Sequence, residues 1–145
     1  MSASMAEKLQ QLVAAEMGRL RGISEEEASE KPAPEKWSRK EMLGHLIDSA
    51  SNNHQRFVRA LNEDELVYPA YAQNEWVKSQ AYNREEWSSL VDLWQAINLH
   101  LAHIIKGVPP EKLPVPCRIG SNPPVTLEAL IADYLRHMEH HLEKI

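Results

Sequence analysis

The sequence has few of the features that mark secreted or membrane proteins. Its one cysteine, Cys117, excludes an internal disulfide and is typical of a chain in a reducing compartment. No apolar run approaches the roughly 20 residues that a membrane-spanning helix needs. The first twelve residues lack the basic and then apolar order of a secretory signal. We therefore expect a cytoplasmic protein that does not enter a membrane.

Basic residues are also in short supply. Lys and Arg number 16 against 21 Asp and Glu, so the formal net charge is -5 and the isoelectric point is about 5.8. Binding driven by nucleic-acid phosphates needs a clustered excess of positive charge. The sequence therefore predicts no nucleic-acid partner.

Apolar residues recur at three- and four-residue steps in four segments, which is the period of amphipathic helices. The first segment runs from about 4 to 21. The second opens at Ser38, which forms an S-x-x-E capping box with Glu41, and continues to about 61. Asn83 and Glu86 mark the third, with Gly107 as its stop, and Thr126 is a suitable N-cap for the last.

The connections between these segments are long and rich in proline. They cover residues 24–36, 62–82 and 108–125, and none of them shows sustained alternation of the kind that predicts a strand. The 145 residues fit a single domain, 1–145. The fold class expected is all-α, a four-helix bundle with long connections.

Seven histidines are present, and their positions on the helices separate them. His137 and His141 share one helical face at i, i+4 spacing, which brings two imidazoles close enough to bind one metal ion. His140 points away from that face. His100 and His103 lie off the apolar stripe of the third helix and are expected at the surface.

The second helix carries a polar stripe opposite its apolar face. Its members are His45, Asp48, Asn52, Arg56 and Arg59. A polar helix face usually meets solvent, and the alternative is that this one lines a polar pocket inside the bundle. The histidine pair is equally open to two interpretations, packing or metal binding. A metal site would need a third ligand from another helix, and His45 is the best-placed candidate.

Three segments together carry a family resemblance. They are residues 37–49 (WSRKEMLGHLIDS) with the polar positions that follow, 71–77 (YAQNEWV) and 137–142 (HMEHHL). Their order and spacing resemble the DinB/YfiT-like superfamily over nearly the whole chain. The chain departs from the pattern in two places. Ala72 stands where relatives often have an acidic residue, and the chain stops at Ile145, one turn after His141, so a short tail is expected to be missing.

The resemblance implies a four-helix bundle that holds one divalent ion through His45, His137 and His141. Zinc and nickel suit imidazole ligands best, and iron or manganese would also be accepted. Three neutral imidazoles leave positions open on the ion, unlike a closed structural site. The resemblance also implies a homodimer.

Two chemistries follow from this resemblance, both on a small-molecule substrate. One is hydrolysis by water that the ion activates, and the other is transfer of a low-molecular-weight thiol. The alternatives are a metal-binding or ligand-binding module without catalysis, and a structural bundle with packed histidines.

The chemistry of individual side chains suggests their roles in such a site. Asp48 is a candidate general base or orienter of a ligand, or else a partner in an ion pair. Arg56 and Arg59 could hold a substrate carboxylate, or form salt bridges. Asn52 and three loop residues are the candidate substrate-binding set, namely Tyr71, Gln73 and Trp76, although Trp76 could instead seal the core.

Trp37 is expected to pack in the core or to act as a hydrophobic staple before its helix. Cys117 has an arginine beside it, but no histidine partner nearby in the sequence, so a catalytic role is not expected.

Overall fold

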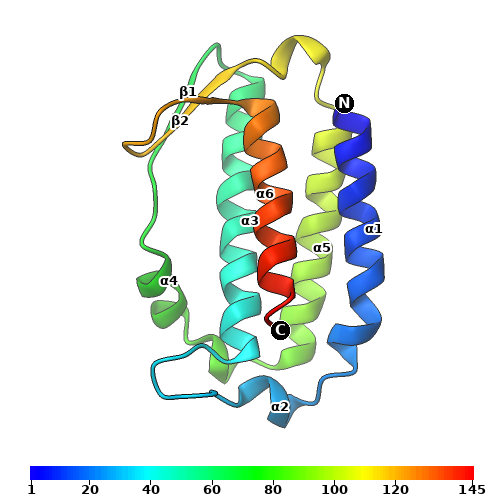
Figure 1. Ribbon diagram of the computed structural model, residues 1–145, viewed down its shortest axis with the longest axis vertical. Helices are drawn as coiled ribbons and strands as arrows, with labels where there is room; N and C mark the ends of the chain where they lie inside the picture. The colour runs from blue at the N-terminus through cyan, green and yellow to red at the C-terminus, as the bar shows by residue number, and fades with distance from the viewer.

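The computed structural model describes residues 1–145 and has four long upright helices at its centre (Figure 1). They are α1 (Ser2–Arg21), α3 (Arg39–Leu61), α5 (Trp87–Lys106) and α6 (Leu127–Leu142). In the view of Figure 1, α1 and α6 run downward, whereas α3 and α5 run upward. The predicted all-α four-helix bundle is therefore confirmed.

The parallel direction of α3 and α5 requires a long crossover between them. This crossover leaves the upper end of α3, passes down the outside of the bundle and enters α5 at the lower end (Figure 1). It contains β1 (Leu66–Tyr68), α4 (Gln73–Gln80) and a 3₁₀ turn at Tyr82–Arg84. Because α4 and the 3₁₀ turn both pack against α3, the crossover covers a face of α3 that a simple hairpin would leave exposed.

Local sequence explains where most of the helices begin. The Ser38 hydroxyl accepts the backbone N–H of Glu41, whose carboxylate accepts the N–H of Ser38, as the capping box predicted. Thr126 caps α6 by accepting from the backbone N–H of Ala129. The predicted cap at Asn83 is wrong, because its amide donates to the carbonyl of Ser29 and its oxygen accepts from Ser38.

The connections contain more structure than their sequences indicate. Residues 24–36 include a short helix, α2 (Glu25–Ser29), which has its own capping box between Ser24 and Glu27. Residues 108–125 include a 3₁₀ turn (Pro110–Lys112) and β2 (Pro116–Ile119), and β3 (Val125–Thr126) precedes α6. The expectation of no strands is therefore wrong.

The three strands form a small sheet at the upper end of the bundle, in the order β1-β2-β3. β1 pairs with β2 in parallel, with Leu66 opposite Cys117, and β2 pairs with β3 antiparallel. The sheet ties the start of the crossover to the segment that leads into α6. Two connections far apart in the sequence are thereby fixed beside the helices that they join.

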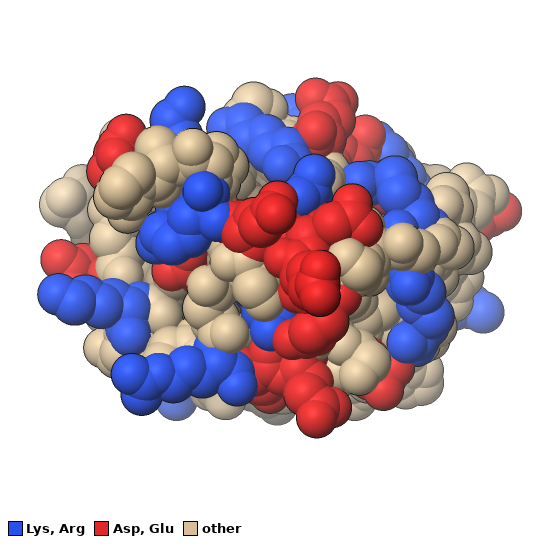
Figure 2. Space-filling model, turned by 90° about the horizontal axis from the view of Figure 1, so that it is seen from below, with Lys and Arg blue, Asp and Glu red and all other residues tan.

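One hydrophobic core of 33 buried residues runs through the bundle. Its largest fully buried side chains include Trp94 and Phe57. None of the helices is long and apolar enough to span a membrane. Figure 2 shows the lower end, where acidic side chains form a central band with basic ones around it, so this face has no continuous basic surface.

Candidate metal centre

The histidines of α3 and α6 converge in the lower half of the bundle. His45 comes from α3, and His137 and His141 come from successive turns of α6. One nitrogen from each lies within 4.8 Å of the others. The structure thus brings together the three residues that the sequence proposed as metal ligands.

The spacing of two of the imidazoles matches a shared metal ion. The Nε2 atoms of His45 and His137 are 3.3 Å apart. Two nitrogen ligands at usual zinc distances and a tetrahedral angle would stand about 3.4 Å apart. No carboxylate or thiol joins the cluster, so the donor set is three imidazoles. These residues therefore fit one divalent ion with positions left open for other ligands.

Burial keeps the cluster in the neutral form that binds metals. Desolvation, together with repulsion from His137 and His141 when they are charged, lowers the pKa of His45 to about 4. Desolvation likewise lowers the pKa of His141 to about 4, and that of His137 in the same direction. The Nδ1 atoms of His45 and His141 are buried without a hydrogen-bond partner. At neutral pH each of the three imidazoles is therefore uncharged and has one ring nitrogen that can bind a metal ion.

Neighbouring residues fix the end of α6 on which two of the histidines lie. The Arg19 guanidinium donates to the carbonyl oxygen of Leu142 at 3.0 Å, and that of Arg39 donates to Ile145 at 2.9 Å. Both bonds satisfy groups at the C-terminal end of the helix. The Trp37 ring lies 5.0 Å from the ring of His45, so this half-buried tryptophan packs on a member of the cluster.

Asp48 lies one turn after His45 and is buried. Its Oδ1 atom accepts from the Tyr82 hydroxyl at 2.6 Å and from the Gln80 amide at 2.8 Å, whereas Oδ2 is buried with no partner. Desolvation raises the pKa of Asp48, although the two hydrogen bonds oppose this. The alternative of an ion pair for Asp48 is not what the structure shows.

Two backbone features let the crossover reach Asp48. Gly44 allows the Tyr82 ring to lie directly against α3, where a methyl group would collide with it. Ala81 adopts a left-handed conformation with φ 48°, which turns the chain between Gln80 and Tyr82. Both neighbours of Ala81 can therefore direct their side chains to the same carboxylate.

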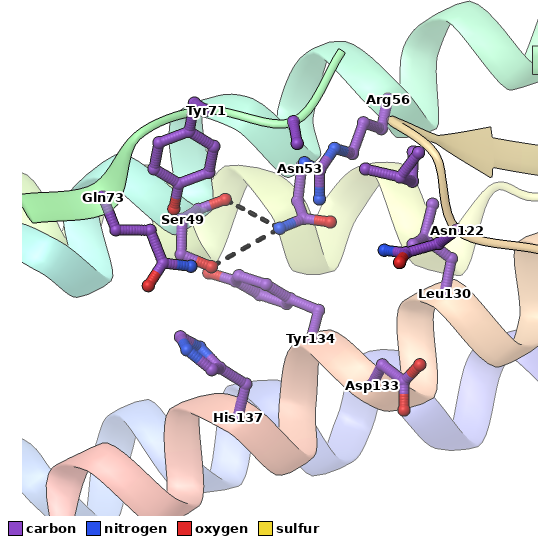
Figure 3. Close-up of a pocket in the computed structure, with 12 residues that line it drawn as sticks. Ser49, Asn53, Arg56, Tyr71, Gln73, Asn122, Leu130, Asp133, Tyr134 and His137 are labelled. Atoms are coloured by element: carbon purple, nitrogen blue, oxygen red, sulfur yellow. Dashed lines mark hydrogen bonds between the residues drawn. The ribbon is translucent and has the colours of Figure 1, made fainter. Parts of the chain in front are cut away.

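A cavity of about 270 Å³ lies between α3, α6 and the crossover (Figure 3). His137 belongs to its wall and also to the histidine cluster, so the two features adjoin. The other lining residues are Ser49, Asn53, Arg56, Ala70, Tyr71, Gln73, Ile119, Asn122, Leu130, Asp133 and Tyr134. Desolvation raises the pKa of Tyr71 to about 12, which keeps this phenol neutral.

The structure brings some of the predicted site residues together and separates others. Arg56, Tyr71 and Gln73 line the cavity. Asn52 is buried but donates to the backbone carbonyl of Asp48. Trp76 lies outside the wall, with 39% of its surface exposed and its ring 4.8 Å from that of Tyr71, so it does not seal the core.

The polar stripe of α3 is therefore divided between the buried interior and solvent. Its first three members, His45, Asp48 and Asn52, are buried, Arg56 is half-buried and Arg59 is exposed. Arg59 forms no salt bridge, and donates to Gln55 at 3.3 Å. The usual assignment of a polar helix face to solvent holds only at the end of the stripe.

Three of the four remaining histidines lie at the surface, as the sequence indicated. His100, His103 and His140 are exposed. Cys117 is buried in β2, and desolvation raises the pKa of its thiol to about 11. This thiol is therefore protonated and inaccessible at neutral pH.

Several residues of the site gave no recognisable signal in the sequence. Gln80 and Tyr82 belong to a segment without a helical period. Asn122 follows the turn after β2, and reaches the cavity only because the sheet forms. Asn53 is one of the polar positions that follow the motif at 37–49, and in the structure its amide donates to the carbonyl oxygen of Ser49 at 2.8 Å.

Comparisons with known proteins agree with this geometry. A model of the DinB superfamily matches residues 8–145. A protein of Halalkalibacterium halodurans, provisionally assigned as a metal-dependent hydrolase, is 28% identical over 109 residues, which cover 75% of this chain and 63% of that protein. A relative from Oceanobacillus iheyensis with the same provisional assignment is 24% identical over 123 residues, 85% of this chain and 70% of its own length.

Among solved structures, YfiT from Bacillus subtilis has a TM-score of 0.82 and 18% sequence identity, with 97% of this chain and 81% of YfiT covered. YfiT is described as having an unusual four-helix bundle topology. At this level of identity the likeness concerns the fold.

Proposed function

Because the chain belongs to the DinB superfamily, we propose that it is a metal-dependent hydrolase with one divalent ion held by His45, His137 and His141. The provisional assignment of its relatives as metal-dependent hydrolases supports this proposal. The substrate would be a small molecule, since the adjoining cavity measures about 270 Å³.

The observation that carries the proposal is a cluster of three neutral imidazoles, one of which, His137, lines the adjoining cavity. Such a donor set adds no negative charge, so the ion keeps its full charge for other ligands. A divalent ion held there would act as a Lewis acid that lowers the pKa of water or of a thiol and polarises the substrate. A structural site would instead be closed by a fourth protein ligand.

We assign the proton-accepting role to Asp48. Hydrogen bonds from Tyr82 and Gln80 hold its Oδ1 atom, and this leaves Oδ2 to accept a proton. Desolvation raises the pKa of this carboxyl toward the range that suits a general base. Crossover residues thus support the base, which itself lies on α3.

The substrate would contact Tyr71 and Gln73, which line the cavity. Trp76 would act through Tyr71, whose ring it packs against. Asn52 would act by holding the backbone at Asp48, to whose carbonyl it donates at 2.9 Å. These two are positioning residues in the proposal.

Transfer of a low-molecular-weight thiol is the second candidate function. The uncharged donor set also favours it, because an ion with three neutral ligands stabilises a thiolate as well as a hydroxide. The chain's own thiol is buried, so the reacting thiol would be a separate small molecule that binds as a second substrate. Binding of metal without turnover would identify a non-catalytic module instead.

Three finer features are part of the proposal. Zinc or nickel suits the all-imidazole donor set better than iron or manganese. Leu93 and Leu99 are exposed apolar residues on α5, at 45% and 43% exposure, and would lie in a homodimer interface. A single reduced thiol fits a cytoplasmic location.

The first experiment is elemental analysis of tag-free protein after incubation with zinc and nickel. We expect about one ion per chain in the wild type, and less than about a tenth of this in His141→Ala. His140→Ala is the matched control, because this exposed neighbour should leave the ion content unchanged. Equal metal in all three proteins would disprove the assignment of the site.

The loaded protein is then assayed against panels of esters and amides and for thiol conjugation. Turnover that disappears both with chelator and in His141→Ala supports a metal-dependent enzyme. Hydrolysis supports the first candidate, and conjugation of an added thiol supports the second.

A further inference from the structure

Arg56 is the only positively charged side chain in the wall of the cavity. None of the six ion pairs of the structure includes it. The only acidic residue in the wall, Asp133, pairs instead with Arg136. The cavity therefore contains a guanidinium without a counter-ion.

The position of Arg56 is costly for a charged group that has no partner. The side chain is half-buried, and its Nε atom is buried with no hydrogen-bond partner. Removing a cation from water without a compensating partner is unfavourable. Three other arginines have such partners: Arg19 and Arg39 donate to carbonyl oxygens, and Arg21 pairs with Asp92 at 2.5 Å.

Contact with an aromatic ring orients the guanidinium but does not replace an anion. The Cζ atom of Arg56 lies 5.5 Å from the centre of the Tyr68 ring. Arg59 lies 5.9 Å from the same ring, yet it is exposed to solvent. The two arginines thus share an aromatic neighbour, and only Arg56 also faces the cavity.

Figure 3 places Arg56 and His137 at opposite ends of the lining residues, with Asn53 and Tyr134 between them. Arg56 follows His45 by eleven residues along α3. At the usual rise, the two Cα atoms are about 16 Å apart, and the side chains shorten the gap between their polar ends. A molecule in the cavity can therefore extend from the guanidinium toward the histidine cluster.

We propose that Arg56 binds a carboxylate of the substrate, so that the substrates are small carboxylic acids with the reacting group at the other end. The inference rests on the proposed function, because the histidine cluster defines the reacting end. A guanidinium matches the two oxygens of a carboxylate in a bidentate pair. With no second Lys or Arg in the wall, a monoanion fits better than a phosphate dianion.

The test measures binding to chelator-treated protein, so that no metal ion competes for the carboxylate. Benzoate and butyrate are titrated by calorimetry or by NMR, each beside its neutral amide of nearly the same shape. We expect at least one of the acids to bind about tenfold or more tightly than its amide. Arg56→Gln should remove this preference, and Arg56→Lys should keep only part of it.

Arg59→Gln is the matched control, since Arg59 shares the helix and the aromatic neighbour of Arg56 and should leave binding unchanged. Melting curves establish that each variant is folded. If Arg56→Gln does not fold, the comparison with the wild type uses Arg56→Lys instead. Equal binding of acids and amides, or a preference that survives in Arg56→Gln, would overturn the proposal. So would tighter binding of inorganic phosphate than of either acid.

Failure of the metal site would be recognised separately. The ion content of Arg56→Gln should equal that of the wild type, because Arg56 is not among the metal-binding candidates. Loss of carboxylate binding with normal metal would therefore concern Arg56 alone. Absence of metal with normal carboxylate binding would concern the histidines alone.

Discussion

At the scale of single residues, Asp48 combines a fixed oxygen with a free one. Replacement by Asn keeps the size of the side chain and an oxygen that can accept from Tyr82, but removes the proton acceptor. We expect Asp48→Asn to lower the turnover of a substrate on which the wild-type protein acts by about 10²- to 10⁴-fold. The measurement is the steady-state rate of the metal-loaded protein. Unchanged turnover in a folded variant with full metal content would contradict the role of Asp48.

The lowered pKa values of the histidines should make the free energy of unfolding of the metal-free protein depend on pH. Their folded-state pKa values are lowered, to about 4 for His45 and His141, from the usual 6.5. Between these values the unfolded chain binds more protons than the folded one. The free energy of unfolding should therefore be fully retained above about pH 6.5 and decrease as the pH falls toward about 4.

Urea denaturation at several pH values between 4 and 7 checks this dependence. A shallower decrease is expected for His141→Gln, in which one of the titrating groups is absent. The same slope in both proteins would show that His141 does not contribute to the dependence.

The sequence could identify the three ligand candidates because each is determined by local helical geometry. The i, i+4 relation of His137 and His141 needs only α6, and His45 belongs to a recognisable polar stripe. The hydrogen-bond donors to Asp48 were not predictable in this way. Gln80 and Tyr82 reach it from a left-handed turn at Ala81, and alanine in a sequence gives no indication of such a turn.

At the scale of elements, α3 and the crossover depend on a close approach at Gly44. A methyl group there would collide with the Tyr82 ring, so Gly44→Ala should destabilise the protein by about 1–3 kcal/mol. It should also separate Tyr82 from Asp48. The free energy of unfolding from urea titration measures the first effect, and turnover measures the second.

The chain contains its own control for this substitution. Gly18 lies within α1 and has no atom within 4 Å of the place that a methyl group would occupy. Gly18→Ala should therefore stabilise the protein by about 0.5–1 kcal/mol, through helix propensity alone. Equal effects of the two substitutions would argue against the importance of the contact with Tyr82.

The long helices could be predicted from their periods and caps, whereas the short elements could not. α4 has eight residues and buries only Val77, so it has no apolar stripe to recognise. β1 has three residues, and it becomes a strand by pairing Leu66 with Cys117, far along the chain. Such elements are specified by tertiary pairing, which a local pattern does not contain.

At the scale of the whole molecule, an ion at the histidine cluster would join α3 to α6. A ligand that binds only the folded state raises stability by about 2.7 kcal/mol at 100 times its Kd. For a domain of this size, zinc or nickel at that concentration should raise the Tm by about 5–10 °C. Thermal denaturation with metal and with chelator tests this, and His141→Ala should show no shift.

The separation of His45 and His137 by 92 residues has a consequence for the order of assembly. His137 and His141 need only one nascent helical turn to meet, so they can capture an ion while most of the chain is still unfolded. His45 joins them only after the chain has closed a large loop, which is a late and entropically demanding event. An ion held by all three histidines should therefore be lost only as slowly as the whole protein unfolds. An ion held by His137 and His141 alone should exchange rapidly.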